Sequence, residues 1–376
     1  MHRTTTARTP QRCWAGARIM TMLVALAMNS AAALAAGPYA YLPSYFRNTV
    51  SVVDLSDTAA TPGTFTVSGT ENNSGYYGVA LSAKDGMLYI SDYVNETVFQ
   101  IDTATGVTVH SYFVGVSPRG IAVDPSGRHV YVANSASSGL SIIDTSTFEV
   151  GEVDFGSLSG SAFPSPIGVA LNLSGTRAYV TDTSVGHRVC RINIASPPAN
   201  VSNSDCVVVG AVDDDGANPS ALAVSPDGTR VYVVNHSESS VSVVDTAGLV
   251  VTRTFPLGYS SPNGIAISAS GKRAYVGTSL GKIIALDLTR VADTEQDPVM
   301  DVISDPAIFA VQGVAISPDG TRLLAVDNGN SQLHLINIVG DADIRVGGVN
   351  VNQGPYAIGQ FTKLDAIFVS GFEKSG

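Results

Sequence analysis

The sequence predicts an all-β protein that forms a single seven-bladed β-propeller, with four antiparallel strands in each blade. Three observations predict this fold. A sequence unit recurs every 42 to 53 residues, turn signals divide each unit into short strands, and the two chain ends together complete one more unit. With 376 residues, 44% of them hydrophobic, the chain is long enough to bury the core of such a fold.

The repeated unit begins with a small residue and apolar neighbours, and it continues through a polar turn into a second apolar segment. Six whole copies are present, and they begin at Gly78, Gly120, Gly168, Ala221, Gly264 and Gly313. One blade of a propeller needs a period of about this length, because four short strands and their turns occupy 40 to 50 residues.

The unit that begins at Ala221 shows how each copy divides into strands. Its first strand, at 223–224, runs into Ser-Pro-Asp-Gly at 225–228, where Pro in the second and Gly in the fourth position favour a type I turn. Apolar segments at 231–234, 241–244 and 250–255 follow, separated by polar turns. We therefore expect four antiparallel strands in each unit.

The seventh blade is expected to combine the two ends of the chain. Residues 354–361, GPYAIGQF, match the first strand of the unit, whereas residues 38–55 match the second and third strands without a first. We expect the strand at 355–361 to contact the strand at 39–42. Such closure by the N- and C-terminal strands would leave no open sheet edge.

The N-terminal residues 1–35 are predicted to be a secretory signal peptide. Four Arg residues precede an apolar run at 19–36, and Ala-Leu-Ala at 33–35 is a small-residue cleavage pattern. A retained transmembrane anchor is the alternative. The propeller is then expected to span residues 36–363, followed by a short tail at 364–376. We expect an extracytoplasmic protein in the periplasm, at the cell surface or released, with no membrane span once the signal is cleaved.

Charge and cysteine content agree with export. Loss of residues 1–35 removes four Arg and no acid, which lowers the formal net charge from −11 to −15. A chain this acidic is not expected to bind nucleic acid, because the phosphates would repel it. Cys190 and Cys206 remain, and an even pair in an oxidising compartment predicts a structural disulfide.

The repeats resemble the YVTN family of β-propeller repeats. The matching segments are YVAN at 131, YVTD at 179, YVVN at 232 and YVGT at 275, and the resemblance covers about residues 38–361. It implies the propeller fold. It implies little about activity, because that family includes surface-layer proteins, binding proteins and segments of enzymes, and related seven-bladed propellers include lactonases.

Polar residues that recur in every blade are predicted to be structural, because a residue repeated around the ring is a poor candidate for a unique catalyst. Asp and Asn side chains bond their own backbone in turns. This interpretation covers the residues in the first turns and at the ends of the second and third strands, which include Asp227, Asp319, Asp102, Asp144, Asp245, Asp287, Asn134, Asn235, Asn193 and Asn337.

The candidate ligand site consists of residues that differ between blades. By register, the residue before the repeated small residue lies at the mouth of the central channel, and these residues are Tyr77, Arg119, Ile167, Ser220, Asn263, Gln312 and Tyr356. Two tyrosines, one cation and three neutral hydrogen-bonding groups would suit a small polar or anionic ligand. The alternative is that they only fill and solvate the mouth.

The same face is expected to carry His187, His236 and Glu238, which the other blades lack. The connection at 211–216 contributes Asp213, Asp214 and Asp215, three adjacent acids that would suit a weak Ca²⁺ site, although their spacing does not match a D-x-D-x-D-G loop. Solvated loop acids are the alternative, and no other cofactor is expected.

Two functions remain open from the sequence. The first is a monomeric, non-catalytic binding scaffold that takes a protein or a small polar or anionic ligand at the channel mouth. The alternative is a hydrolase of the gluconolactonase type on the same face, with or without a metal ion, in which Arg119 and His187 or His236 would act beside an acid. No HExxH or P-loop pattern is present.

Overall fold

We analysed a computed structural model of the chain. It describes residues 38–59, 61–69, 74–137, 139–154, 164–184, 186–195, 205–210, 216–339, 344–351, 355 and 358–359. These residues belong to one compact unit, 33–376. The predicted signal peptide at 1–35 and the predicted tail at 364–376 lie outside the described residues.

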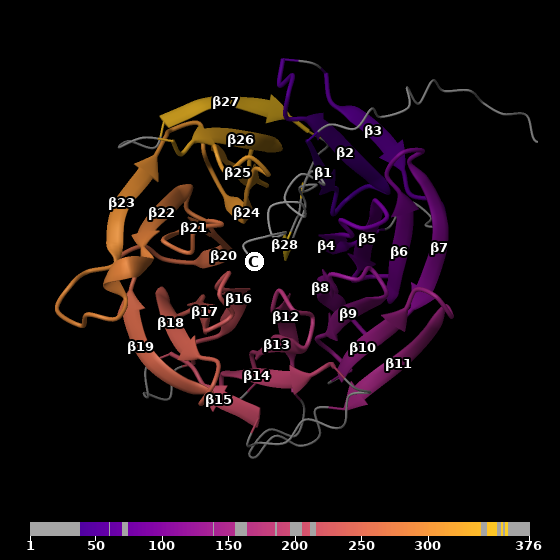
Figure 1. Cartoon of the computed structure of the whole chain (residues 1–376). Helices are drawn as coiled ribbons and strands as arrows, with labels where there is room; N and C mark the ends of the chain where they lie inside the picture. The colour runs from indigo at the N-terminus through magenta and orange to yellow at the C-terminus, as the bar shows by residue number, and fades with distance from the viewer. Residues whose placement is uncertain are drawn as a thin grey trace, which may run out of the picture. The chain divides into compact units, whose positions relative to one another are not determined.

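The prediction of an all-β, seven-bladed propeller is confirmed. Figure 1 shows the sheets arranged as a ring around a common centre, and each blade is an antiparallel sheet whose strands follow one another from the centre to the rim. The structure also contains a short 3-10 turn, η2 (Leu288–Arg290).

The strands of blades 1 to 4 run outward in chain order. Blade 1 contains β1 (Tyr39–Pro43), β2 (Thr49–Asp54) and β3 (Gly63–Thr66). Blade 2 contains β4 (Tyr76–Leu81), β5 (Met87–Asp92), β6 (Thr97–Asp102) and β7 (Val107–Phe113). Blade 3 contains β8 (Pro118–Val123), β9 (His129–Asn134), β10 (Gly139–Asp144) and β11 (Glu149–Asp154). Blade 4 contains β12 (Pro166–Leu171), β13 (Arg177–Asp182), β14 (Arg188–Asn193) and β15 (Cys206–Val208).

Blades 5 to 7 have the same order. Blade 5 contains β16 (Pro219–Val224), β17 (Arg230–Asn235), β18 (Ser240–Asp245) and β19 (Val250–Pro256). Blade 6 contains β20 (Pro262–Ile267), β21 (Arg273–Thr278), β22 (Lys282–Asp287) and β23 (Val299–Ser304). Blade 7 contains β24 (Val311–Ile316), β25 (Arg322–Asp327), β26 (Gln332–Asn337) and β27 (Ile344–Asn350). The last strand, β28 (Ile358–Gly359), lies at the channel.

The ring closes through the C-terminal segment, but the detailed pairing differs from the simplest expectation. Pro355 forms an antiparallel bridge with Ser44, directly after β1, and Ile358 and Gly359 then pair in parallel with Gly78 and Val79 of β4. Strand β28 thus contacts both β24 and β4, as an innermost strand between blades 7 and 2 should (Figure 1). Arg322 of blade 7 also donates to the carbonyl oxygen of Leu55 in blade 1, at 2.9 Å.

Burial follows the position of each strand in its blade. Second and third strands are almost entirely buried, whereas the outer strands alternate between exposed and covered residues. The Tyr of the repeated motif packs between blades and is at most 3% exposed in five of them, as Tyr89, Tyr131, Tyr179, Tyr232 and Tyr275. Stacking of apolar blade faces therefore supplies the core.

The repeated glycine is required by the close approach of the innermost strands. A Cβ atom on Gly168 would lie 2.7 Å from the carbonyl oxygen of Ser220 in the next blade, and one on Gly78 would meet the carbonyl oxygen of Arg119. Real side chains do not approach a backbone this closely. The glycine therefore fixes the spacing of the strands that line the channel.

The recurring aspartates hold turns, as the sequence predicts. Asp227 accepts hydrogen bonds from Ser225 Oγ at 2.5 Å and from the backbone N–H of Thr229 at 3.0 Å, and Asp319 makes the same contacts in blade 7. These side-chain and backbone bonds outweigh burial and lower the pKa of Asp227. The turn aspartates are therefore part of the scaffold.

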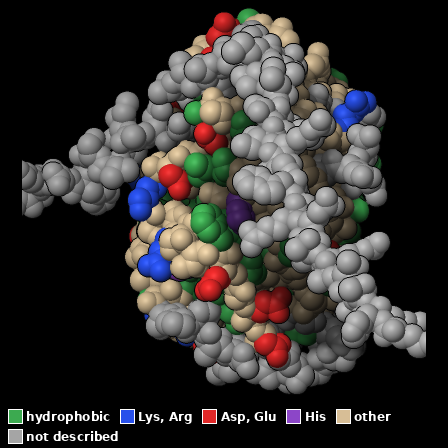
Figure 2. Space-filling model, turned by 90° about the vertical axis from the view of Figure 1, so that its right-hand side faces the viewer, with side chains coloured by type: hydrophobic (Ala, Val, Ile, Leu, Met, Phe, Trp, Pro, Cys, Tyr) green, Lys and Arg blue, Asp and Glu red, His purple; other side chains and the backbone are tan. Residues whose placement is uncertain are grey.

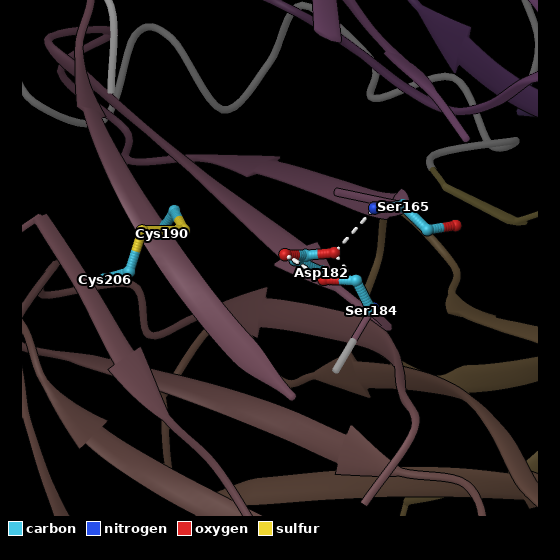
Figure 3. The surroundings of a disulfide bond; sticks show 5 residues. All are labelled: Ser165, Asp182, Ser184, Cys190 and Cys206. Carbon is cyan, nitrogen blue, oxygen red and sulfur yellow. Dashed lines mark hydrogen bonds between the residues drawn. A yellow bond between two sulfur atoms is a disulfide. The ribbon is translucent and has the colours of Figure 1, made fainter. Parts of the chain in front are cut away.

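Cys190 and Cys206 form a disulfide between β14 and β15, as the sequence predicts (Figure 3). The two cysteines are 16 residues apart, and β15 has only three residues, so the bond joins a short rim strand to its blade. We expect Cys190→Ala together with Cys206→Ala to lower the free energy of unfolding by about 3 kcal/mol in urea titrations. Reductant should destabilise the native protein similarly and leave the double variant unaffected. A reductant effect on that variant would contradict this assignment.

The rim of blades 2 and 3 exposes apolar side chains. Val107, Val109 and Phe113 of β7 are exposed, and His110 stacks on the exposed ring of Phe148 in blade 3, with centroids 4.7 Å apart. In Figure 2, which faces this side of the molecule, hydrophobic side chains lie around a histidine where the surface is visible. Among the described residues, no helix has the length and hydropathy needed to cross a membrane.

Candidate functional site

The propeller has two faces, which we name by their loops. Backbone hydrogen bonds join the turn after a second strand to the connection before the first strand of the same blade, as in Tyr93 to Gly75 and His236 to Asn218. We call the face formed by these turns and connections the mouth face. The opposite face, formed by the turns between first and second and between third and fourth strands, is the turn face.

The predicted ring residues share one structural position. Each is the second residue of an innermost strand, close to the mouth face, and each is half-buried; the six described members are Tyr77, Arg119, Ile167, Ser220, Asn263 and Gln312. Tyr356, the seventh, lies outside the described residues. The register argument therefore places six different side chains at equivalent points around the channel.

Arg119 lies between two tyrosines. Its guanidinium carbon is 5.1 Å from the ring centroid of Tyr77 and 5.3 Å from that of Tyr93, so the cation has an aromatic face on two sides. Hydrogen bonds from Ser117 and Arg119 lower the pKa of Tyr93. Ser91 Oγ donates to the Arg119 carbonyl oxygen at 2.6 Å and accepts from Gly78 N–H at 2.8 Å, which positions the Arg119 backbone.

The Arg119 cation has no anionic partner in the part of the chain that the structure describes. Its Nε atom is buried and forms no hydrogen bond to any described residue. Leaving a buried donor unpaired costs about 1–3 kcal/mol, and in a chain of net charge −11 an unpaired cation is unusual. The arrangement is therefore open to an anion from outside the fold.

The neutral ring residues across the channel are partly engaged with neighbouring blades. Ser220 Oγ lies 3.4 Å from the carbonyl oxygen of Asn263, and Asn263 Nδ2 donates to Ser279 Oγ at 2.6 Å and to the Val311 carbonyl oxygen at 3.2 Å. These bonds fix the side-chain orientation of Asn263. The half-buried amide of Gln312 lies one blade further on.

His187, His236 and Glu238 lie on the mouth face, but their contacts diverge. Nδ1 of His236 lies 2.9 Å from the Pro262 carbonyl oxygen in blade 6, whereas Nδ1 of His187 accepts from Asn218 N–H at 3.4 Å. Glu238 accepts from Ser240 Oγ at 3.3 Å. No hydrogen bond or ion pair joins either histidine to Arg119 among the described residues.

The weak Ca²⁺ site predicted from Asp213, Asp214 and Asp215 lies outside the described residues. Within the described ranges, no three His, Cys, Asp or Glu side chains are close enough together to hold a metal ion.

Acids at the ends of second strands face the scaffold. Asp92, Asp182 and Asp327 are at most 2% exposed, and each binds the connection that precedes its own blade. Figure 3 shows Asp182 between Ser165, whose N–H donates at 2.7 Å, and Ser184. The oxygens of these carboxylates already accept hydrogen bonds from backbone and side-chain donors of the same loops.

Tyr93 is the member of the site that the sequence did not single out. It follows the second strand of blade 2, where the other five whole units have Ser, Thr, His, Ser and Asn. That departure from the repeat was the available signal, because the ring of Tyr93 covers the Arg119 guanidinium.

Comparisons with known proteins support a β-propeller family. The family model described as Lactonase, 7-bladed beta-propeller matches residues 30–153, about a third of the chain. A seven-bladed β-propeller protein of Mycobacterium tuberculosis is 28% identical over 144 residues, which are 38% of this chain and 35% of that protein. The match thus spans about a third of the relative. The finer resemblance to YVTN repeats stays a prediction.

Solved structures share the fold at low sequence identity. A hydrazine synthase chain from Kuenenia stuttgartiensis superposes with a TM-score of 0.64 at 21% identity, covering 78% of this chain and 90% of that one. A protein of unknown function from Desulfotomaculum acetoxidans gives 0.67 at 14%, with coverages of 85% and 99%. A proposed 6-phosphogluconolactonase from Bacteroides fragilis gives 0.65 at 13%, with coverages of 86% and 97%.

Proposed function

We propose that this propeller binds a small anionic ligand at the channel mouth, with Arg119 as the anion-binding residue. The observation that carries the proposal is the Arg119 guanidinium, placed between Tyr77 and Tyr93 with no described carboxylate beside it and a buried Nε without a partner. Asn263 and Gln312 supply neutral hydrogen-bonding groups across the channel for the rest of the ligand.

The charge of the whole chain strengthens this assignment. An acidic protein lowers the local concentration of anions. An anion site here therefore needs a cation in direct contact with the ligand and an apolar wall that keeps the local dielectric constant low. Two tyrosine rings provide that wall. The predicted export of the chain would place the site in contact with solutes outside the cytoplasm.

Replacement of Arg119 by Gln is expected to weaken anion binding about 10- to 100-fold, because one charge-assisted interaction is worth roughly 1.5–3 kcal/mol. Titration calorimetry with gluconate, 6-phosphogluconate and inorganic phosphate would measure it. Arg128→Gln is the matched control, since Arg128 is an exposed cation on the turn face that already pairs with Asp144. Equal affinities of wild type and Arg119→Gln for all three anions would refute the proposal.

A lactonase-like hydrolase is the second candidate function. The partial match to a lactonase family model and the similarity to a proposed 6-phosphogluconolactonase favour it. A phosphorylated lactone is also an anion, so it would use Arg119 in the same way. A panel of aldonolactones with and without phosphate, assayed by pH-stat with added Ca²⁺ or EDTA, separates the two functions. Turnover that Arg119→Gln lowers supports the hydrolase, and binding without turnover supports the binding protein.

A further inference from the structure

The described loops of the two faces differ in their exposed charges. The loops of the turn face expose acidic side chains in blades 1, 2, 5, 6 and 7, beside the exposed cations Lys84, Arg128 and Lys272, and these acids are Asp57, Asp85, Asp227, Asp293, Glu295, Asp297 and Asp319. In the described loops of the mouth face, the exposed charged residues are Arg47 and Glu96. Among the described loops, most of the exposed acids thus lie on the turn face, whereas Asp213, Asp214 and Asp215, in a connection of the mouth face, lie outside the described residues.

The mouth face instead exposes large apolar side chains. Six of its loops each carry one that is 38% to 66% exposed, and these residues are Phe46, Val94, Val116, Tyr259, Leu280 and Phe309. A scattered exposed apolar residue needs no explanation, but six around one opening, with few exposed charges in the described loops between them, are typical of an interaction surface. On the turn face, the described loops expose Phe148, Leu173 and Val339 among many acids.

The chemistry of this face defines its occupant. Arg119 near its centre needs a carboxylate or another anion, and the surrounding loops need apolar side chains. A segment in which acids stand among large apolar residues satisfies both requirements. A bare anionic membrane fits less well, because the described loops of the mouth face offer few cations to it.

One segment of this chain has that composition. Residues 364–373 read LDAIFVSGFE, with Asp365 and Glu373 flanking Ile367, Phe368 and Phe372. They lie beyond β28 and outside the described residues.

Strand β28 runs toward the turn face. It is parallel to β4, which begins at the mouth face and ends at the turn face, so β28 itself leads away from its own mouth. From Gly359 to Glu373, an extended chain spans roughly 46 to 50 Å. That is enough to leave the turn face along the channel axis and enter the mouth of a second copy.

We propose that residues 364–376 of one copy bind the mouth face of another, with the carboxylate of Asp365 or Glu373 at Arg119 and the apolar side chains against the exposed loops. This inference rests on the proposed anion site at Arg119. The contact joins different surfaces of the two copies, so it is heterologous and extends the assembly head to tail. It replaces the expectation of a monomer with concentration-dependent association.

The test uses a fluorescein-labelled peptide of residues 362–376 and the chain without residues 1–35 at nanomolar concentration. We expect saturable binding by fluorescence anisotropy, weakened at least tenfold by Arg119→Gln, by a peptide carrying Asp365→Asn and Glu373→Gln, and by a Leu280→Ser, Phe309→Ser variant. A scrambled peptide and Arg128→Gln are the controls. Sedimentation should show association that deletion of 364–376 abolishes.

Several results would overturn the inference. One is absent peptide binding while Arg119-dependent binding of 6-phosphogluconate persists, which leaves the proposed function intact. Another is peptide binding that Arg119→Gln does not change. Association that survives deletion of 364–376, or phosphatidylglycerol vesicle binding lost in the Leu280→Ser, Phe309→Ser variant, would assign the surface to another occupant. If neither the peptide nor the small anions respond to Arg119→Gln, both proposals fail.

Discussion

Replacing His334 by alanine is expected to lower the free energy of unfolding by about 3–5 kcal/mol. Nε2 of His334 lies 2.9 Å from Oδ2 of Asp327, and neither side chain is exposed to solvent. Removal of the imidazole takes a partner from a buried carboxylate and opens a cavity between β25 and β26. Urea unfolding followed by near-UV circular dichroism of the buried tyrosines would measure the loss.

The pair matters because Asp327 also holds the connection between blades 6 and 7. Its carboxylate accepts from the N–H groups of Phe309 at 2.8 Å and Ala310 at 2.9 Å. Burial would raise the pKa of Asp327, but the hydrogen bonds from His334 and these amides outweigh it and lower the pKa to about 2. The folded state thus binds this proton more weakly than the unfolded state, whose carboxyl has a pKa near 3.8.

The sign of the pH dependence follows. Asp327 contributes stability that is fully present above about pH 4 and is lost as the pH falls toward 2, by roughly 2 kcal/mol. Asp327→Asn should remove that part of the acid sensitivity while lowering stability at neutral pH. An unchanged slope of unfolding free energy against pH between 4 and 2 in this variant would contradict the assignment.

The chain offers a matched control for His334. His129 Nδ1 lies 3.0 Å from Oδ2 of Asp124, close to the 2.9 Å of the buried pair, but the His129 side chain is 33% exposed and its Nε2 also lies 3.9 Å from Oδ2 of Asp144. His129→Ala should cost less than about 1 kcal/mol, because solvent screens an accessible pair. If the two alanine variants lost equal stability, burial would not be the cause of the His334 effect.

The fold could be predicted because its determinants repeat. Small residues at the start of each unit reflect contact between neighbouring innermost strands, and Asp227 and Asp319 recur because each first turn needs the same capping. Because the pattern is repeated six times, a departure in one copy does not hide the strands and turns that the copies share. The closure could be predicted because the two chain ends together complete one repeat. The parallel pairing of β28 with β4 could not, because it depends on packing at the channel, which no repeat encodes.

The candidate site could be predicted only in part, because function lies where the repeat is broken. Register placed Tyr77 and Arg119 at the mouth, since strand position fixes which end of the channel a residue lies near. It did not place Tyr93 over Arg119, because that contact depends on side-chain directions from two blades. Nor did it bring His187 and His236 together, since a shared face does not determine where loop side chains point.

Arg253→Ala is expected to destabilise the protein by about 3 kcal/mol and to loosen a specific loop. The Arg253 guanidinium, on outer strand β19, donates to the carbonyl oxygens of Arg290, Val291, Asp293 and Gln296, at 2.6 to 3.4 Å. It also lies 5.6 Å from the ring centroid of Phe255. Charged donors make the stronger hydrogen bonds, and all four carbonyls would lose this donor at once, although those of Arg290 and Asp293 also accept from backbone N–H groups.

The planar shape of the guanidinium is what this contact uses. Lysine keeps the charge but presents a single nitrogen, so Arg253→Lys should lose most of the same stability. The loop at 291–298 connects blade 6 strands, and limited proteolysis should cut it faster in both variants, before global unfolding. Arg128→Ala, which removes an exposed ion pair, should leave both stability and cleavage nearly unchanged. A fully stable Arg253→Lys protein would show that charge alone, rather than the fork of donors, joins blade 5 to blade 6.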